Sequence, residues 1–101
     1  NASAPVVLRE IARLRAGLLA VDLEDFASVE ARLSTLASPG HALRHSAREA
    51  LAIAAIKAGD DARALEWLTR IDEDNEAPDT VRNRVELMLN MLAGKGASAQ
   101  G

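Results

Sequence analysis

Two histidines four residues apart, His41 and His45, are the side chains with the clearest potential to bind a metal ion. On a helix this spacing places both imidazoles on one face, where they would act as neighbouring ligands. The next carboxylate along the chain is Glu49. With no other ligand close in sequence, we interpret the pair as two surface imidazoles and predict no metal site.

A run of acidic residues, "DEDNEAPD" at 72–79, has the alternating carboxylates of a calcium loop in Asp72, Asp74 and Glu76. A calcium loop also needs glycine at its sixth position and a bidentate glutamate at its twelfth. Those positions are Ala77 and Asn83. We therefore interpret the run as a solvated acidic loop between two helices.

Catalysis has no candidate residues in this sequence. The chain has no cysteine, which excludes disulfides, thiolate metal sites and cysteine nucleophiles. No Ser-His-Asp arrangement with a nucleophile elbow and no phosphate-binding loop is present. A net charge of −3, with acidic and basic residues interleaved, also argues against a nucleic-acid partner, which would need a basic face. The sequence predicts a non-enzymatic protein without cofactors.

Helical spacing of apolar residues predicts a single all-α domain over residues 5–93. We expect helices at about 5–21, 23–37, 41–58, from 60 or 61 to 71, and 78–93. Asp22 is expected to cap the second helix, and Asp60 or Asp61 the fourth. Gly59 is expected in the left-handed conformation that ends the third helix, and Gly94 is expected to stop the fifth. Residues 1–4 are expected to be disordered or vector-derived, and residues 94–101 to form a flexible tail.

An internal repeat appears when the chain is aligned with itself at an offset of about 35 residues. The first helix then matches the third in side-chain size and polarity, and the second matches the fourth. In the first helices Ala12, Ala16, Gly17, Ala20 and Val21 fall on Ala47, Leu51, Ala52, Ala55 and Ile56. The repeat predicts two helical hairpins and one closing helix.

The second unit resembles a tetratricopeptide repeat. Its first helix has the large-small pair Leu51-Ala52, its turn is Gly59-Asp60, and its second helix has the small residue Ala64 followed by Trp67 and Leu68. It departs from the pattern at Ala55, where an aromatic residue is usual, and at Ile71, where a small one is usual. The first unit is degenerate, with Gly17 kept at the small position and Glu24 in place of the turn glycine. The resemblance implies a right-handed superhelix of about two antiparallel hairpins with a C-terminal capping helix. It also implies that Trp67 packs between the hairpins.

Residues 6–93 are also similar to a narrower group, the ancillary SecYEG translocon subunits of the YfgM-like type. This similarity is carried by "LAIAAIKAGDDARALEWLTRIDEDNEAPDTVRNRVELMLNML". It implies a scaffold or chaperone-like domain in the periplasm, anchored to the inner membrane by an N-terminal segment that is absent here. The implied partners are components of the translocon or periplasmic chaperones. The fragment has no apolar run that could span a membrane and is expected to be soluble, without membrane contact of its own.

A tetratricopeptide superhelix lines its concave face with residues of its first helices. The corresponding positions here are Leu14, Leu18, Val21, Glu49, Ile53 and Ile56. Most of them are apolar, so they are either core positions covered by further helices or a groove for an apolar segment of a protein partner. A second hypothesis is self-association as a homodimer, because about two and a half hairpins are fewer than the three repeats that usually sustain such a stack.

Overall fold

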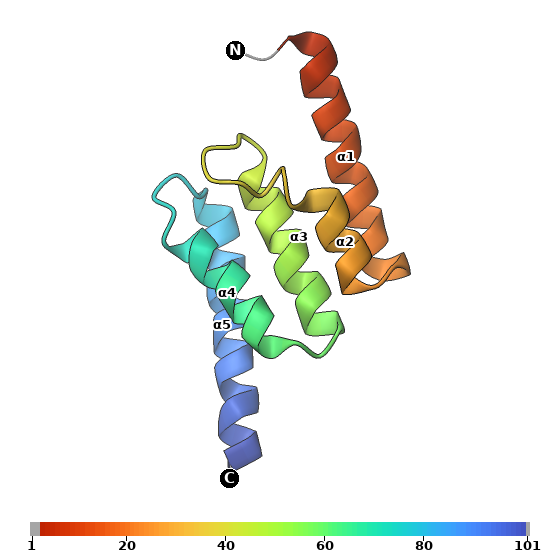
Figure 1. Ribbon diagram of the computed structural model, residues 1–101. Helices are drawn as coiled ribbons and strands as arrows, with labels where there is room; N and C mark the ends of the chain where they lie inside the picture. The colour runs from red at the N-terminus through yellow and green to blue at the C-terminus, as the bar shows by residue number, and fades with distance from the viewer. Residues whose placement is uncertain (1–2, 101) are drawn as a thin grey trace.

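The computed structural model describes residues 3–100, and side chains up to residue 96, and this part of the chain is helical without strands. The helices are α1 (Ala4–Leu23), α2 (Phe26–Leu33), α3 (Arg44–Lys57), α4 (Asp61–Asp72) and α5 (Asp79–Gln100) (Figure 1). The predicted all-α class is therefore confirmed. Ser3 is the N-cap residue of α1, so the disorder expected at 1–4 is wrong for Ser3 and Ala4; Asn1, Ala2 and Gly101 lie outside the described residues.

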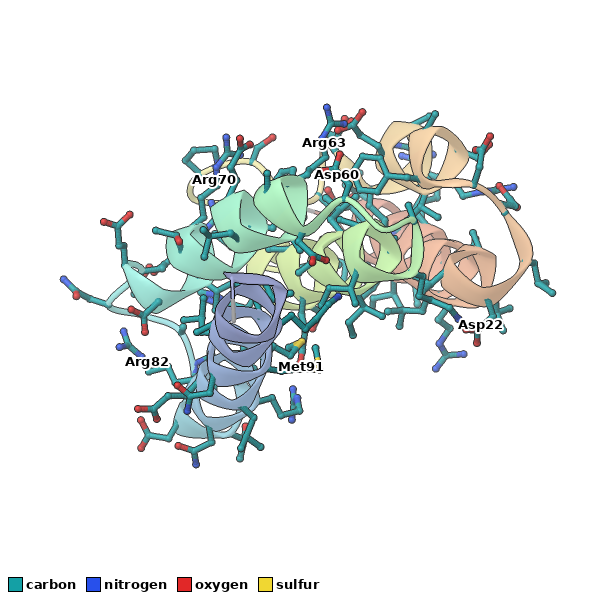
Figure 2. All side chains as sticks on the ribbon, turned by 90° about the horizontal axis from the view of Figure 1, so that it is seen from below. Asp22, Asp60, Arg63, Arg70, Arg82 and Met91 are labelled. Atoms are coloured by element: carbon teal, nitrogen blue, oxygen red, sulfur yellow. The ribbon has the colours of Figure 1, made fainter. Side chains whose placement is uncertain are left out.

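The helices form two layers. Helices α1, α3 and α5 run in the same direction in one layer, and α2 and α4 run in the opposite direction in the other (Figures 1 and 2). Helix α3 is central, because it contacts each of the other four helices. Side chains on the exposed side of α3 therefore lie between those of α1 and α5 on the surface of the first layer.

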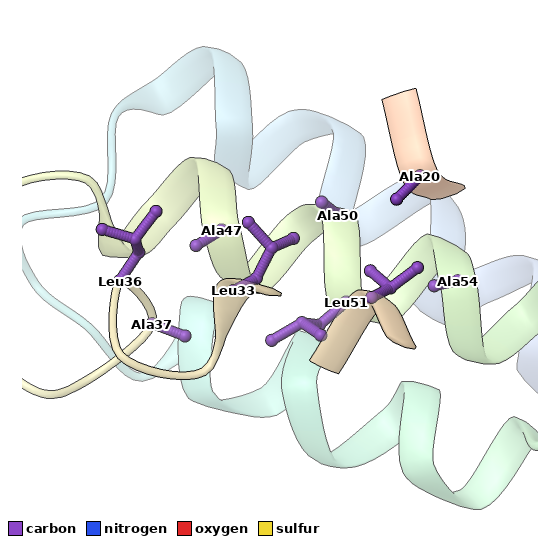
Figure 3. Close-up of a cluster of buried hydrophobic side chains, with 9 residues drawn as sticks. Ala20, Leu33, Leu36, Ala37, Ala47, Ala50, Leu51 and Ala54 are labelled. Carbon is purple, nitrogen blue, oxygen red and sulfur yellow. The ribbon is translucent and has the colours of Figure 1, made fainter. Parts of the chain in front are cut away.

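Two apolar clusters make up the core. The first joins α1, α2, the segment after α2 and α3; its buried residues are Ala20, Val29, Leu33, Leu36, Ala37, Ala47, Ala50, Leu51 and Ala54 (Figure 3). The second joins α3, α4 and α5 through Ala52, Leu68, Ile71, Ala77, Val81 and Val85. Trp67 packs against both clusters, which confirms its predicted place between the hairpins.

Two of the predicted helix ends are confirmed around the α3–α4 turn. Gly59 has a φ of 77°, in the left-handed region that other residues resist. Asp60 caps α4, since its Oδ1 accepts a hydrogen bond of 3.1 Å from the backbone N–H of Arg63. The turn that carries the resemblance to the repeat therefore has the expected local structure.

The predicted start of the second helix is wrong. The cap is Asp25, whose Oδ1 accepts a 2.9 Å hydrogen bond from the N–H of Ser28, and α2 spans only the eight residues from Phe26 to Leu33. Asp22 instead lies inside α1, which continues to Leu23. A bidentate ion pair between Glu24 and Arg32, at 2.9 and 3.0 Å, holds the turn between the two helices. This pair connects the residue at the end of α1 with the last turn of α2.

Helices α3 and α5 also differ from their predicted bounds. Helix α3 begins at Arg44 rather than His41, because the segment 34–43 forms turns that bury Leu36 and Ala37 in the core. Helix α5 continues through Gly94 to Gln100, so the predicted helix stop at 94 is wrong. A stop of that kind needs a left-handed glycine, and among the described residues only Gly40 and Gly59 have positive φ.

Close approach of α1 and α2 depends on Gly17. A Cβ atom at this position would lie 2.2 Å from Cδ2 and 2.5 Å from Cγ of Leu33, a side chain that is fully buried. The small residue that the repeat pattern places here thus lets Leu33 pack directly on the backbone of α1.

Replacing Gly17 with alanine should therefore destabilise the protein by about 1–3 kcal/mol through overpacking. The intrinsic preference for alanine over glycine inside a helix, roughly 1 kcal/mol, opposes this loss. Gly94→Ala is the matched control, since Gly94 is also helical and a Cβ atom added there would have no neighbour within 4 Å. Chemical denaturation should show a loss for the first variant and no loss for the second. Equal stability of the two variants would contradict the packing of α1 on α2.

Candidate functional site

The six residues predicted for the concave face lie on two neighbouring helices of the same layer. Leu14, Leu18 and Val21 are on α1, and Glu49, Ile53 and Ile56 are on α3. Leu18 is 46% exposed and Ile53 is 37% exposed, whereas the other four are half-buried. Leu14 and Val21 pack against the first core cluster. The exposed apolar part of this surface is thus centred on Leu18 and Ile53.

An ion pair between α1 and α3 indicates the relative positions of Leu18 and Ile53. Lys57 Nζ of α3 donates a hydrogen bond to Asp22 Oδ1 of α1. Asp22 follows Leu18 by one helical turn, and Lys57 follows Ile53 by one turn. Because α1 and α3 run in the same direction, Leu18 and Ile53 occupy corresponding positions one turn before the ion pair.

A second ion pair connects α3 to α5 on the same surface. Arg84 donates two hydrogen bonds to the Glu49 carboxylate, at 2.7 and 2.9 Å, and this bonding raises the pKa of Arg84. Ile53 follows Glu49 by one turn and Met88 follows Arg84 by one turn, so Ile53 and Met88 occupy corresponding positions on α3 and α5. Helix α5 therefore forms the other edge of the surface.

We call this surface the three-helix face; its members are Leu18 and Asp22 of α1, Glu49, Ile53 and Lys57 of α3, and Arg84, Met88 and Met91 of α5. Met91 is 47% exposed. Figure 2 shows Asp22 and Met91 on one side of the molecule, and Asp60, Arg63 and Arg70 on the other. An apolar strip across three helices thus lies between two ion pairs.

The contribution of α5 was missed in the sequence, although a signal for it exists. Applying the 35-residue offset a second time takes Glu49, Ile53 and Ile56 to Arg84, Met88 and Met91. Helix α5 is therefore in register as the first helix of a third unit. The first of these positions is Glu49 on α3 but Arg84 on α5, and this difference makes the repeat harder to recognise in the sequence. The same difference allows Arg84 to pair with Glu49.

A separate cluster of charged residues joins the segment after α2 to the loop before α5. Arg44 donates hydrogen bonds of 2.6 Å to Asp74 Oδ2 and 2.6 Å to Glu76 Oε1, and a third of 2.9 Å to the backbone oxygen of His41. The Arg44 guanidinium holds the pKa of the Asp74 carboxyl well below its usual range. The predicted solvated acidic loop is thus wrong at Asp74, which is largely buried, and Glu76 is ion-paired.

Two more arginines complete this cluster. Buried Arg48 donates 2.9 Å to the backbone oxygen of Ala37 and 3.2 Å to Asp74 Oδ2. Arg82 of α5 donates 2.6 Å to the backbone oxygen of Asp74 and 3.2 Å to that of Ala77. Since Arg48 and Arg82 donate to backbone oxygens of two irregular segments, the cluster holds the loops in place.

The two histidines are not the surface imidazoles that were predicted. His41 Nε2 lies 2.6 Å from Glu10 Oε2 of α1, and its Nδ1 accepts a 3.0 Å hydrogen bond from the N–H of Leu43. His45 is largely buried with no hydrogen-bond partner at Nδ1, and burial lowers its pKa, with repulsion from Arg44 adding to the effect. Within the described residues, no group of three or more potential ligands is placed to hold a metal ion.

The chain matches no protein-family model, no curated protein and no solved structure. No helix in the described part of the chain is both long enough and apolar enough to cross a membrane.

Proposed function

We propose that this protein is a non-enzymatic protein-binding module, and that the three-helix face binds an apolar segment of its partner. The observation that carries the proposal is the exposed strip formed by Leu18, Ile53 and Met91. These side chains come from three helices in one layer, and exposed apolar side chains gathered in this way are typical of interaction sites.

The chemistry of this face suits an amphipathic helix. Methionine side chains are flexible and polarizable, so Met88 and Met91 can adapt to different apolar groups. The ion-paired residues at the two ends, including Asp22 and Arg84, offer polar contacts to the rim of a bound segment. We infer that the partner contributes a helix with one apolar face and polar residues beside it.

The finer fold that we propose is a right-handed superhelix of the tetratricopeptide type, with α5 as the first helix of an incomplete third unit. The close packing at Gly17, the left-handed Gly59 and the shared layer of α1, α3 and α5 support it. In such a superhelix the first helices line the concave face, which would make the three-helix face concave.

By its resemblance to the YfgM-like proteins, we propose that the module is the periplasmic scaffold or chaperone-like domain of a membrane-anchored envelope protein linked to the Sec translocon. This part of the proposal rests on sequence resemblance alone. Site-specific cross-linking from Met91 in cells would test it, because a translocon or periplasmic chaperone component should then be recovered as the cross-linked partner.

Replacing Ile53 with glutamate should weaken binding of a leucine-faced amphipathic helical peptide by at least about 10-fold, because a charge would replace the central apolar contact. The thermal midpoint should stay close to that of the wild type, since a partly exposed glutamate remains hydrated. Fluorescence anisotropy with labelled peptide measures the first effect, and circular dichroism the second. Leu65→Glu, on exposed α4 surface in the other layer, is the control and should bind normally. Unfolding of the Ile53 variant would show that this position is core.

A further inference from the structure

Two arginines of α1 recur in α3. At the 35-residue offset, Arg9 aligns with Arg44. The same offset aligns Arg13 with Arg48. In the second unit the two arginines share the carboxylate of Asp74, at 2.6 Å and 3.2 Å. The second unit therefore shows which chemical group this pair of side chains binds.

The loop of the first unit offers no carboxylate to the arginines of α1. The position equivalent to Asp74 is Pro39. The position equivalent to Glu76 is His41, which is bonded to Glu10. The first unit thus keeps the two arginines without the acidic residues that they bind in the second unit.

The acidic residues of the first unit are also engaged elsewhere. Those between positions 3 and 43 have these partners: Glu10 with His41, Asp22 with Lys57, Glu24 with Arg32, Asp25 with the N–H of Ser28, and Glu30 with Arg63. None of these contacts includes Arg9 or Arg13. Within the described part of the chain, the charges of these two arginines are therefore left for another molecule.

A hollow of about 370 Å³ between α1 and α2 is placed to receive such a group. Its lining residues are Arg13, Ala16, Ala31, Arg32 and Thr35. At the repeat offset, Arg13 aligns with Arg48, and Thr35 aligns with Arg70. Arg48 and Arg70 line a hollow of the second unit together with Asp74. The two hollows are thus equivalent in the repeat, and the one between α1 and α2 has no acidic residue in its lining.

Arg32 and Thr35 add hydrogen-bond donors to this hollow. Arg32 uses Nε and Nη2 in its bonds to Glu24, which leaves the N–H groups of Nη1 for another acceptor. The hydroxyl group of Thr35 can donate as well. The hollow therefore offers two guanidinium groups and a hydroxyl group to an anion.

We propose that the hollow between α1 and α2 binds an acidic segment of a protein partner, with Arg13 and Arg32 holding one carboxylate. This carboxylate takes the place that Asp74 takes in the second unit. Arg9, one helical turn before Arg13, binds a second carboxylate, as its counterpart on α3 binds Glu76. The segment that fits has two acidic residues separated by one residue, as in the loop of the second unit.

An NMR titration of the ¹⁵N-labelled full chain with a peptide of sequence DEDNEAPD, which copies residues 72–79, tests this proposal. Because the arginines are exposed, we expect a dissociation constant of about 0.1–1 mM at low ionic strength. Signals of Arg13, Arg32 and Thr35 should shift together and saturate. The peptide should not replace the loop at Arg44, since Arg82 also holds that loop. A titration without saturation, or with shifts only elsewhere, would overturn the proposal.

Arg13→Glu should weaken peptide binding at least about 10-fold, because it reverses the charge at the centre of the site. Arg15→Glu is the matched control. It changes the net charge equally and replaces an exposed residue of α1, but two positions along a helix lead to a different side. It should change the dissociation constant by less than about 2-fold. Equal losses in the two variants would show general charge attraction and would contradict the site.

Changed ligands test which acidic group is recognised. A peptide with Asp74→Asn and Glu76→Gln should bind at least about 10-fold more weakly, and a scrambled peptide of the same composition should also bind more weakly. Equal binding of the scrambled peptide would overturn the proposal, as would displacement of the peptide by inorganic phosphate at equal concentration.

This site and the three-helix face can fail separately. Ile53→Glu should leave binding of the acidic peptide intact, and Arg13→Glu should leave binding of the leucine-faced peptide intact. A variant that lost both activities would contradict two independent sites.

Discussion

Replacing Asp74 with asparagine should lower the urea midpoint of unfolding by about 1 M or more, because it removes the carboxylate that two enclosed arginines share. Arg44 and Arg48 both donate to Asp74, and both are buried. In this variant Arg48 loses its carboxylate partner and keeps its hydrogen bond to the backbone oxygen of Ala37. The loss should arise from leaving a positive charge buried rather than from the strength of one bond.

Asp72→Asn provides the control for this experiment. Asp72 is an exposed carboxylate two residues earlier at the end of α4, so its replacement should leave the midpoint nearly unchanged. Similar midpoints for the two variants would show that the cluster around Asp74 does not hold the two loops together.

The same cluster predicts how stability depends on pH. The pKa of Asp74 is lowered in the folded state by its hydrogen bonds to Arg44. The contribution of Asp74 to folding stability is therefore complete above its unfolded-state pKa, near 4, and is lost as the pH falls below that pKa. Burial lowers the pKa of His45, so protonation of His45 should begin to disfavour folding below about pH 6.5. Denaturation of the wild type should therefore become easier in two steps on acidification, and the lower step should be smaller in Asp74→Asn.

Leu33→Ala should be the most damaging substitution in the apolar core, with a loss of about 2–5 kcal/mol. Leu33 is fully buried in the first cluster and fills the space that Gly17 leaves open on α1. Chemical denaturation measures the loss. Gly17→Ala should cost much less in the Leu33→Ala background than in the wild type, because the alanine methyl group would then occupy part of the cavity. Strict additivity of the two losses would contradict direct packing between these residues.

Local patterns in the sequence were sufficient to predict the number of helices and the α3–α4 turn. Gly59 and Asp60 are the residue types that end one helix and cap the next, and both act where the sequence places them. The start of α2 was harder to predict, because Asp22 and Asp25 are three residues apart and either could cap a helix. Local sequence does not decide between such neighbours, since the choice depends on how α1 packs.

The charged cluster could not be predicted, because its partners are distant in sequence. Arg44 and Asp74 are thirty residues apart, and only the packing of α3 against α4 brings them together. The candidate site was predicted in part for a similar reason. Leu18 and Ile53 were found from the repeat, but whether Leu14 and Val21 are surface or core depends on their packing against the first cluster.

Chemical-shift mapping by NMR with a leucine-faced amphipathic helical peptide tests the proposed binding role most directly. Methyl signals of Leu18, Ile53, Met88 and Met91 should shift together and saturate as peptide is added, because these side chains form one apolar strip. The methyl signals of Leu65, in the other layer, should stay in place. Shifts confined to other surfaces, or no shifts at the highest peptide concentration, would contradict the three-helix face as the binding site.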